Sequence, residues 1–328
     1  MPDKKIDESV FLVFTILLYI CKEVVTMAYR VVLIESECSL HLKLNNLLID
    51  KGEGDIWIPL EDISMIVLDN LKIQFTVRLM STLAEHNIGV IMCNIDHLPI
   101  GFYSSYDNHS RISKCIGFQI NKSEEFYDAF WKAIVFQKIN NQKQVLETLG
   151  KNDVTEKLEE LANDIIDGDK TNREAHAAKV YFNNLMNATY SRGNEDILLN
   201  SGLDYGYTII RAFIARLCVG YGLNSQLGIH HKNEYNRFNL VDDLMEPIRP
   251  FVDLIAYRIL EGEEYFKVEH RRKLVNILNH KVKYADKKMY IANMIEEYVS
   301  QYAAFLAEKR ETVVFPKIND YLGEEDDN

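Results

Sequence analysis

Between residues 28 and 107 the hydrophobic and polar positions alternate with a period close to two. Short runs rich in valine, isoleucine and leucine predict strands, and glycine and proline residues separate these runs. The predicted strands cover residues 30–34, 41–49, 55–58, 63–69, 88–94 and 98–104. Residues 74–87 instead have helical spacing. Because the strands follow one another closely, we expect a small β-rich region with mainly antiparallel pairing.

After residue 122 the pattern changes to long segments in which hydrophobic residues recur three and four positions apart, as in amphipathic helices. The expected helices include residues 124–149, 154–167, 172–189, 204–222 and 288–311. The fold class predicted is α+β, with a small N-terminal β-rich domain followed by a larger all-α domain. The predicted boundaries are 27–107 for the β-rich domain, 108–122 for a linker, 123–315 for the α-helical domain and 316–328 for an acidic tail.

The N-terminal segment does not fit the β-rich region that follows it. Residues 10–20 form a continuous apolar run that is too short to cross a bilayer as a helix. Two lysines precede this run, so it resembles the core of a signal peptide. However, Glu23 follows closely, no typical cleavage sequence is present, and Met27 opens the first predicted strand. We therefore favour residues 1–26 as an upstream extension from an over-long start, ahead of a targeting role.

Composition narrows the class of protein. The chain has 37 lysines and arginines against 49 aspartates and glutamates, and its formal net charge is −12. A protein that binds nucleic acid by overall charge is usually basic, so any such role requires local basic patches or a partner. The five cysteines are widely spaced and include no C-x-x-C pair, which argues against a disulfide framework and a structural zinc site. We expect a cytoplasmic protein that does not span a membrane.

One basic stretch stands out in this acidic chain. Within residues 270–289 the only acidic residue is Asp286. We propose that the basic side chains form a phosphate-contacting surface. The alternative is a solvated pair of helices that balances the acidic residues just before it. The basic residues are Arg271, Arg272, Lys273, Lys281, Lys283, Lys287 and Lys288.

A second unusual stretch places carboxylates among hydrophobic residues. Asp242, Asp243 and Glu246 lie beside leucine, methionine and isoleucine, although burying unpaired charge is costly. On a helix, Asp243 and Glu246 would share one face and could share a cation. Pro247 interrupts regular helical hydrogen bonding at this point, so the carboxylates lie at a local break. His231 lies upstream on an expected loop and is a further candidate ligand.

Glu174 falls on the apolar face of its predicted helix, one turn before Ala178, and we expect it to point inward. The alternative is a glutamate in the first helical turn, after Thr171 or Asn172 as N-cap, that is stabilised only by the helix dipole. One histidine with two or three carboxylates is an oxygen-rich set that suits Mg²⁺ or Mn²⁺ better than zinc. We expect such an ion to compensate the buried carboxylates.

Four motifs in the helical region occur in an order that is specific to one family. They are REAHAAKVYF (173–182), LLNSGLDYGYTIIRA (198–212), YGLNSQLGIHH (221–231) and VDDLMEPIRPFVD (241–253). With the opening RVVLIESECSLHLKLNNLLI (30–49), the chain from about residue 27 to 315 resembles the CRISPR-associated integrase family, the nuclease-like subunit of the spacer-acquisition machinery (the Cas-one family). The DLMEPIRP segment and short β-rich domain look most like the versions in type II systems.

This resemblance implies roles for particular residues. Glu174, His231 and Glu246 match the family's metal ligands, and the G-x-x-H spacing from Gly228 selects His231 ahead of the adjacent His230. Asp243 matches an acid that supports or joins the metal site, whereas Asp242 has no counterpart. Arg249 adjoins Glu246 and would either neutralise the carboxylates or reach a substrate phosphate.

The resemblance also implies an activity and partners. The helical domain would be the catalytic domain of a DNA endonuclease and integrase that uses Mg²⁺ or Mn²⁺ and joins 3′-hydroxyl ends of captured foreign DNA to the repeat array. The β-rich domain would form a homodimer, which assembles with a small CRISPR-associated partner dimer on double-stranded DNA. Two alternatives stay open, namely a generic metal-dependent nuclease and a non-catalytic DNA-binding scaffold.

Overall fold

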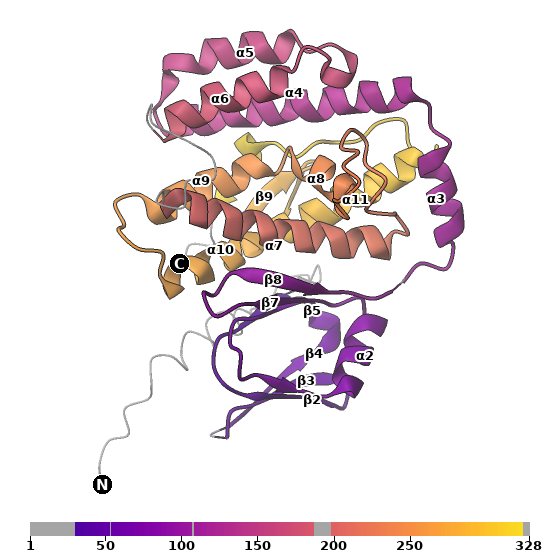
Figure 1. Ribbon diagram of the computed structural model, residues 1–328, viewed down its shortest axis with the longest axis vertical. Coiled ribbons are helices and arrows are strands. Elements are labelled where there is room, and N and C mark those ends of the chain that lie inside the picture. The colour runs from indigo at the N-terminus through magenta and orange to yellow at the C-terminus, as the bar shows by residue number, and fades with distance from the viewer. Residues whose placement is uncertain (1–29, 53, 107, 187–197, 324–328) are drawn as a thin grey trace.

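The computed structural model describes residues 30–52, 54–106, 108–186 and 198–323. Two sheets form its N-terminal part, and a mainly helical part follows (Figure 1). The predicted leader, residues 1–26, and residues 324–328 of the predicted acidic tail lie outside the described residues.

The first sheet has the strand order β1-β5-β7-β8. Its strands are β1 (Arg30–Ile34), β5 (Ile63–Leu68), β7 (Gly89–Cys93) and β8 (Pro99–Tyr103). The β1–β5 and β5–β7 pairs are parallel and only β7–β8 is antiparallel, so the prediction of mainly antiparallel pairing is wrong here. All six residues of β5 are buried, as is usual for the central strand of a parallel sheet, and helix α2 (Val77–Glu85) lies in the crossover to β7.

The second sheet has the strand order β4-β3-β2-β6. Its strands are β2 (Ser39–Lys43), β3 (Asn46–Asp50), β4 (Asp55–Pro59) and β6 (Gln74–Phe75). The β2–β3 and β3–β4 pairs are antiparallel, whereas β6 joins β2 in parallel. Leu44 and Asn45 connect β2 to β3 with φ angles of 51° and 61°, the conformation expected of a two-residue hairpin loop.

Helices dominate the chain after residue 111. They are α3 (Ile112–Ile120), α4 (Glu124–Thr148), α5 (Thr155–Asn163), α6 (Arg173–Leu185), α7 (Leu198–Gly220), α8 (Asn239–Met245), α9 (Arg249–Leu260), α10 (Val268–Asn276) and α11 (Ile291–Leu306). Most of the predicted linker therefore forms helix α3 rather than an extended connection.

A third sheet lies among these helices, so the prediction of an all-α region is wrong. Its order is β10-β9-β11, with β9 (Lys281–Tyr284), β10 (Lys287–Tyr290) and β11 (Tyr321–Gly323). Ala285 and Asp286 have φ angles of 47° and 63° and close the β9–β10 hairpin. The lysine-rich sequence concealed the alternation of these short strands. The third strand, β11, comes from the segment that was predicted to be an acidic tail.

The first sheet packs against the helical part instead of standing apart from it. Val31, Met65 and Ile91 belong to the same buried hydrophobic cluster as Ile209 and Phe213 of α7. Helices α7 and α10 lie over this sheet, with α4, α5 and α6 beyond them (Figure 1). A second cluster fills the space between the two N-terminal sheets and α2.

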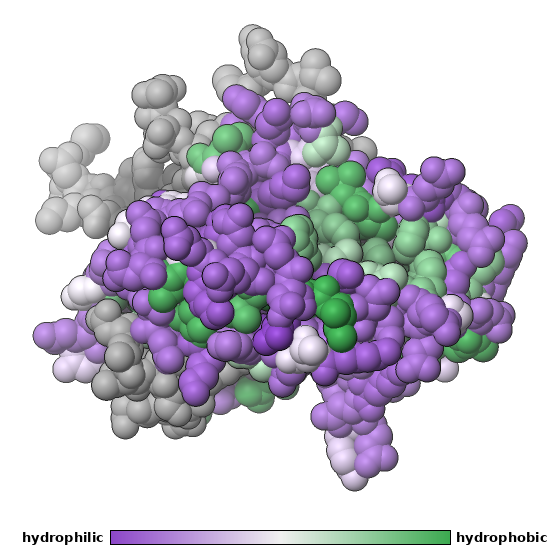
Figure 2. Space-filling view, turned by 90° about the horizontal axis from the view of Figure 1, so that it is seen from above, coloured by the Kyte–Doolittle hydropathy of each residue, from purple (hydrophilic) through white to green (hydrophobic). Residues whose placement is uncertain are grey.

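Seen from the end nearest α5 and α6, the surface is mainly hydrophilic, and hydrophobic residues show mostly in recessed patches (Figure 2). None of the helices within the described ranges is both long and apolar enough to cross a membrane.

Candidate active site

Glu174 lies in the first turn of α6, and its side chain turns toward α4. The carboxylate of Asp169 caps this helix, accepting hydrogen bonds from the backbone N–H groups of Arg173 (2.8 Å) and Glu174 (2.9 Å). The N-cap residue is Asn172, one of the two positions named from the sequence, but its side chain makes no cap hydrogen bond. The Glu174 side chain is 23 % exposed and its Oε1 lies 2.6 Å from Nζ of Lys138.

Glu246 lies in the α8–α9 break, residues 246–248, where Pro247 interrupts the helix. Its side chain is 5 % exposed, and its two oxygens have different partners. Oε1 accepts a hydrogen bond from Nε of Arg249 at 2.9 Å, and Oε2 lies 2.5 Å from Nζ of Lys138. Burial alone would raise the pKa of Glu246, but the charges of Arg249 and Lys138 outweigh it and lower the pKa. Arg249 therefore neutralises a carboxylate, one of its two predicted roles.

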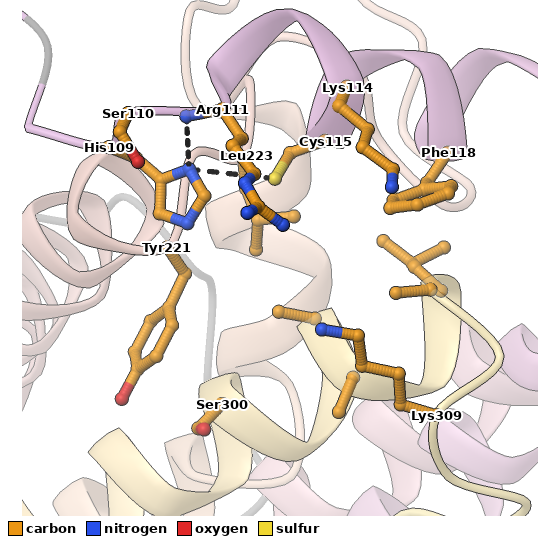
Figure 3. Close-up of a pocket in the computed structure, with 14 residues that line it drawn as sticks. His109, Ser110, Arg111, Lys114, Cys115, Phe118, Tyr221, Leu223, Ser300 and Lys309 are labelled. Atoms are coloured by element: carbon orange, nitrogen blue, oxygen red, sulfur yellow. Dashed lines mark hydrogen bonds between the residues drawn. The ribbon is translucent and has the colours of Figure 1, made fainter.

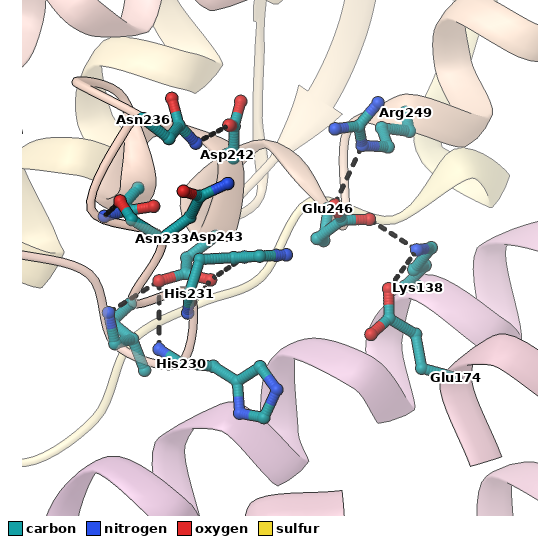
Figure 4. Close-up of polar contacts among 12 residues, drawn as sticks. Lys138, Glu174, His230, His231, Asn233, Asn236, Asp242, Asp243, Glu246 and Arg249 are labelled. Carbon is teal, nitrogen blue, oxygen red and sulfur yellow. Dashed lines mark hydrogen bonds and ion pairs between the residues drawn. The ribbon is translucent and has the colours of Figure 1, made fainter. Parts of the chain in front are cut away.

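Lys138 connects these two glutamates, and the sequence analysis did not identify it. It lies on α4 among buried residues such as Ile134 and Ile139, and its side chain is 9 % exposed. Burial acts to lower the pKa of Lys138, but the charges of Glu246 and Glu174 outweigh this effect and raise it. The one available signal was a lysine on the apolar face of a long helix. Figure 4 shows the ammonium group between the two carboxylates.

His231 is held by Asp243. Its Nδ1 lies 2.5 Å from Oδ1 of Asp243, whose side chain is fully buried. The same carboxylate accepts backbone hydrogen bonds from Ile229, His230 and His231, so it also fixes the loop. The His231 side chain extends toward the side of Glu246 and Lys138 (Figure 4). The hydrogen bond to Asp243 raises the pKa of His231, opposed by burial and supported by the charges of Asp243, Glu246 and Glu174.

His230 has a different environment. Its ring stacks on Trp131 of α4, with ring centroids 4.4 Å apart and an interplanar angle of 2°. The ring of His231 meets Trp131 edge-on. Of the two adjacent histidines, the structure therefore directs His231 toward the glutamates and packs His230 on the helix.

Protein groups contact both aspartates of α8, Asp242 and Asp243. Asp242 pairs with Arg211, whose Nε lies 2.7 Å from Oδ1, and Nδ2 of Asn236 donates to Oδ2 at 2.7 Å. Asp243 is satisfied by the loop backbone and His231. The sequence analysis did not predict these protein partners of Asp242 and Asp243.

The residues fit a divalent ion in type but not in their present arrangement. Among the described residues, no group of three or more His, Cys, Asp or Glu side chains is arranged to hold a metal. Glu174 and Glu246 nevertheless converge on one positive atom, Nζ of Lys138. A histidine whose Nδ1 is held by a carboxylate has its other ring nitrogen available as a ligand, as is common at metal sites. Two carboxylates and one imidazole suit Mg²⁺ or Mn²⁺, provided that the ammonium group leaves.

Asn141, one turn after Lys138, ties the α8–α9 break to the C-terminal segment. Its Nδ2 donates to the carbonyl oxygens of Pro247 (2.7 Å) and Pro316 (2.9 Å). Its Oδ1 accepts from the backbone N–H of Ile318 at 3.1 Å. Helix α4 thus holds the side chain of Glu246 through Lys138, and it holds the backbone of the adjoining residue, Pro247, through Asn141.

Two cavities adjoin this part of the molecule. One of about 780 Å³ is lined by His230, His231 and the loop that includes Tyr235 and Arg237. The other, of about 460 Å³, lies between α3 and α11 and includes none of the candidate residues. Arg111, Lys114 and Lys309 surround the second cavity, and Nδ1 of His109 accepts from the backbone N–H of Arg111 at 3.2 Å (Figure 3).

The predicted basic surface is only partly exposed. Arg271 is buried and its Nε donates to Oδ2 of Asp69 at 3.2 Å, so it does not belong to a surface. Arg272 pairs with Glu35 at 2.6 Å, which also ties α10 to the first sheet. The assignment of Arg271 to a surface is wrong, and its acidic partner lies far away in the sequence, where a local pattern does not reveal it. The exposed members of the set are Lys273, Lys283, Lys287 and Lys288, and Lys281 is partly exposed.

The fold and this charged cluster define a class of protein in which two glutamates from separate segments of a helical region and a carboxylate-held histidine lie together, and a mixed N-terminal sheet packs against the helices. A family model described as CRISPR associated protein Cas1 matches residues 31–283. The chain belongs to this family.

Relatives agree with this assignment. The chain is 33 % identical over 287 residues to the CRISPR-associated endonuclease Cas1 of Neisseria meningitidis serogroup C (strain 8013), covering 86 % of this chain and 94 % of that protein. Among solved structures, a casposase bound to integration product has a TM-score of 0.74 at 21 % identity, covering 91 % of this chain and 96 % of that one. A CAS1 protein from Thermotoga maritima has a TM-score of 0.66 at 16 % identity, covering 88 % and 99 %. These structural likenesses show a shared fold.

Proposed function

We propose that this protein is a metal-dependent DNA integrase of CRISPR adaptation that also has DNA endonuclease activity. It would join the 3′-hydroxyl ends of captured foreign DNA to the repeat array by transesterification. The observation that carries the proposal is the convergence of Glu174 and Glu246, from separate helices, on one cation beside a histidine held by Asp243. The endonuclease name of the Neisseria relative and the casposase likeness support it.

In this proposal Glu174, His231 and Glu246 would hold Mg²⁺ or Mn²⁺, which would supply a Lewis acid for the phosphate under attack. Asp243 keeps Nδ1 of His231 occupied, so that Nε2 is presented as the ligand. Arg249 keeps Glu246 ionised and fixes one of its oxygens. The cavity beside His231 would receive the DNA backbone, with the exposed Lys232 and Arg237 on its lining as phosphate contacts.

The partners are also part of the proposal. We infer a homodimer through the N-terminal sheets and assembly with a small CRISPR-associated partner dimer on double-stranded DNA. A solved complex titled Cas6-RT-Cas1--Cas2 contains a chain with a TM-score of 0.69 to this one. A solved TtCas1-DNA complex has a TM-score of 0.52. Assignment to a type II system and a cytoplasmic location rest on the sequence motifs and composition.

The test is a joining assay with a fragment that carries free 3′-hydroxyl ends and a repeat-containing target. Glu246→Gln should reduce joined product about 10³-fold, because it removes a proposed metal ligand while keeping the side-chain shape. Asp242→Asn is the matched control, since Asp242 is also buried on α8 but pairs with Arg211 instead of Lys138. It should retain activity wherever it remains folded.

The same assay separates the two alternatives. A generic nuclease would cut the target with metal present but yield no joined product. A non-catalytic scaffold would be unaffected by Glu246→Gln and would lose function when its exposed lysines are reversed in charge. If Glu246→Gln joined the fragment to the target as well as wild type does, the proposed site would be refuted.

A further inference from the structure

Lys138 is an unusual residue for its position. It lies in the middle of α4, where its neighbours one turn earlier on the same face, Ile134 and Val135, are fully buried. A lysine is almost never buried at such a position unless its charge is paired. Its partners, Glu174 and Glu246, come from α6 and the α8–α9 break, so three segments distant in sequence depend on one ammonium group.

The ammonium group occupies the space that a metal bound to both glutamates would need. Nζ lies 2.6 Å from Oε1 of Glu174 and 2.5 Å from Oε2 of Glu246. A Mg²⁺ ion takes carboxylate oxygens at about 2.1 Å, so an ion bridging these same two oxygens would collide with Nζ. The two cations therefore exclude each other.

Charge leads to the same conclusion. Glu174 and Glu246 carry two negative charges, and Lys138 and Arg249 carry two positive charges, so the cluster is neutral as it stands. Adding a divalent ion without moving Lys138 would place two extra positive charges beside an ammonium and a guanidinium group. Repulsion between buried charges of this kind is strong at low dielectric constant. Arg249 holds the other oxygen of Glu246, which leaves Lys138 as the group to be displaced.

We propose that Lys138 is the resident cation of the metal-free site, which holds the two glutamates together and which a divalent ion must displace. This inference rests on the proposed metal-dependent function. Lysine suits the role because its flexible four-carbon stem lets the ammonium group swing away, whereas a rigid arginine fork would remain on the carboxylates. The released ammonium group would move toward solvent past Glu174, the more exposed of the two carboxylates, and would be available to a DNA phosphate.

The main experiment compares wild type with Lys138→Met by titrating Mn²⁺ into the full chain in a calorimeter. Methionine keeps the length and apolar stem of the side chain but removes the charge. Without a competitor in the site, Lys138→Met should bind Mn²⁺ at least ~10-fold more tightly than wild type, since wild type must first break the ion pairs. Lys143→Met on the same helix is the matched control. Lys143 pairs with Glu159 at 2.8 Å away from the site, and its loss should leave Mn²⁺ affinity unchanged.

Thermal melts give a second readout that does not depend on activity. In the absence of metal, Lys138→Met should melt at a lower temperature than wild type, because two carboxylates lose their counter-ion. Saturating Mn²⁺ should restore most of that loss and so raise the melting temperature more than in wild type. A variant whose melting temperature falls equally with and without Mn²⁺ would overturn the inference.

A measurement on the wild-type chain covers the case in which the variant does not fold. Lysines are acetylated briefly with an amine-reactive ester and quantified by peptide mass spectrometry with and without Mn²⁺. Lys138 should react slowly in metal-free protein and faster in saturating Mn²⁺, whereas Lys143 should not change. Unchanged labelling of Lys138 under conditions where calorimetry shows Mn²⁺ bound would overturn the inference.

The two proposals fail in different ways. Equal Mn²⁺ affinity in wild type and Lys138→Met overturns the role of Lys138 and leaves the proposed function standing. If neither chain binds Mn²⁺ while both remain folded, the proposed metal site fails and the inference fails with it.

Discussion

Asp69 and Arg271 form a buried ion pair between the first sheet and α10, whereas Glu174, Lys138 and Glu246 form one between α4, α6 and the α8–α9 break. Both members of the first pair are buried, with the Asp69 side chain fully buried and Arg271 6 % exposed. His97 occupies the other oxygen of Asp69 at 2.8 Å. In the second cluster Glu174 is 23 % exposed.

This difference separates a structural cluster from the cluster that we propose to be functional. Arginine is always charged and holds a carboxylate through a rigid planar fork, which suits a permanent join between two parts of the chain. Lysine is a single mobile charge, and in the second cluster it lies next to a partly open glutamate and a histidine that lines a cavity. Burial of charge alone therefore does not identify an active site. Exposure on one side, together with a replaceable cation, is the better indicator.

The most demanding test of this comparison is to remove one partner of the Asp69–Arg271 pair. Asp69→Asn should lower the free energy of unfolding by about 3–5 kcal/mol, because it leaves the buried Arg271 without a counter-charge. Urea unfolding followed by circular dichroism measures this loss. The exposed Asp55→Asn is the control and should change stability little. If Asp69→Asn proved as stable as wild type, the first cluster would not be the structural join described here.

A third buried carboxylate sharpens the comparison, because its direct partners are tyrosines. Asp253 accepts hydrogen bonds from Tyr181 (3.0 Å) and Tyr207, and burial raises its pKa from 3.8 to about 6 despite them. The unfolded chain therefore loses this proton near pH 4, while the folded chain keeps it to about pH 6. Stability from this group is present at low pH and is lost as pH rises through that window.

The expected size follows from the shift of about two pKa units, which corresponds to about 3 kcal/mol. Asp253→Asn cannot titrate, so the free energy of unfolding of wild type minus that of the variant should fall by this amount between pH 3.5 and 6.5. Urea unfolding of both proteins at several pH values provides the profile. A difference that stays constant over this range would show that the folded and unfolded chains bind this proton equally, so that burial does not raise the pKa of Asp253.

The two adjacent aspartates on α8 allow a finer test of the open cluster. Asp243→Asn should weaken Mn²⁺ binding about 10–100-fold, because the amide no longer fixes and polarises His231. Asp242→Asn should leave Mn²⁺ affinity unchanged, since Asp242 contacts Arg211 and Asn236 instead. Calorimetric titration of both folded variants measures the effect. Equal affinities would mean that Asp243 serves only the loop backbone.

The smallest expected effect concerns the exposed lysines that remain from the basic stretch. Lys287→Glu on β10 should weaken DNA binding uniformly across sequences and reduce the slope of log affinity against log salt by about 0.9, the value for one phosphate contact. Fluorescence anisotropy at several salt concentrations gives the slope. Lys157→Glu on α5 is a matched charge reversal at a residue that pairs with Glu160. An equal change in both variants would indicate a general charge effect and no contact at Lys287.

The sequence predicted the broad order of the molecule, because hydrophobic period alone separates the strands before residue 107 from the helices after it. It did not predict which strands pair in parallel. Nearly all residues of β5 are hydrophobic, so the sequence shows no alternation from which the pairing of this strand could be inferred. The β9–β10 hairpin was missed because its strands are only four residues long and are rich in lysine. The alternation of hydrophobic and polar positions is therefore hard to recognise in the sequence.

The candidate site shows the same limit. The carboxylates, His231 and the neutralising Arg249 were identified from the sequence, but two other cationic partners, Lys138 and Arg211, were not. Nothing in the local sequence distinguishes Lys138 and Arg271 from ordinary charged residues of a helix, because their acidic partners lie elsewhere in the sequence. Pairing between distant segments is a property of the packed chain, and a local pattern carries no information about it.

Asn141 gives the end of the described chain a mechanical connection to Glu246. Through one side-chain amide it grips both the carbonyl oxygen of Pro247 and the strand-bound segment at Pro316 and Ile318. Drawing this segment away would remove two of the four hydrogen bonds of the Asn141 amide and leave those to Pro247 and Gln137. The segment that leads into β11 is therefore coupled, through Asn141, to the backbone directly beside Glu246.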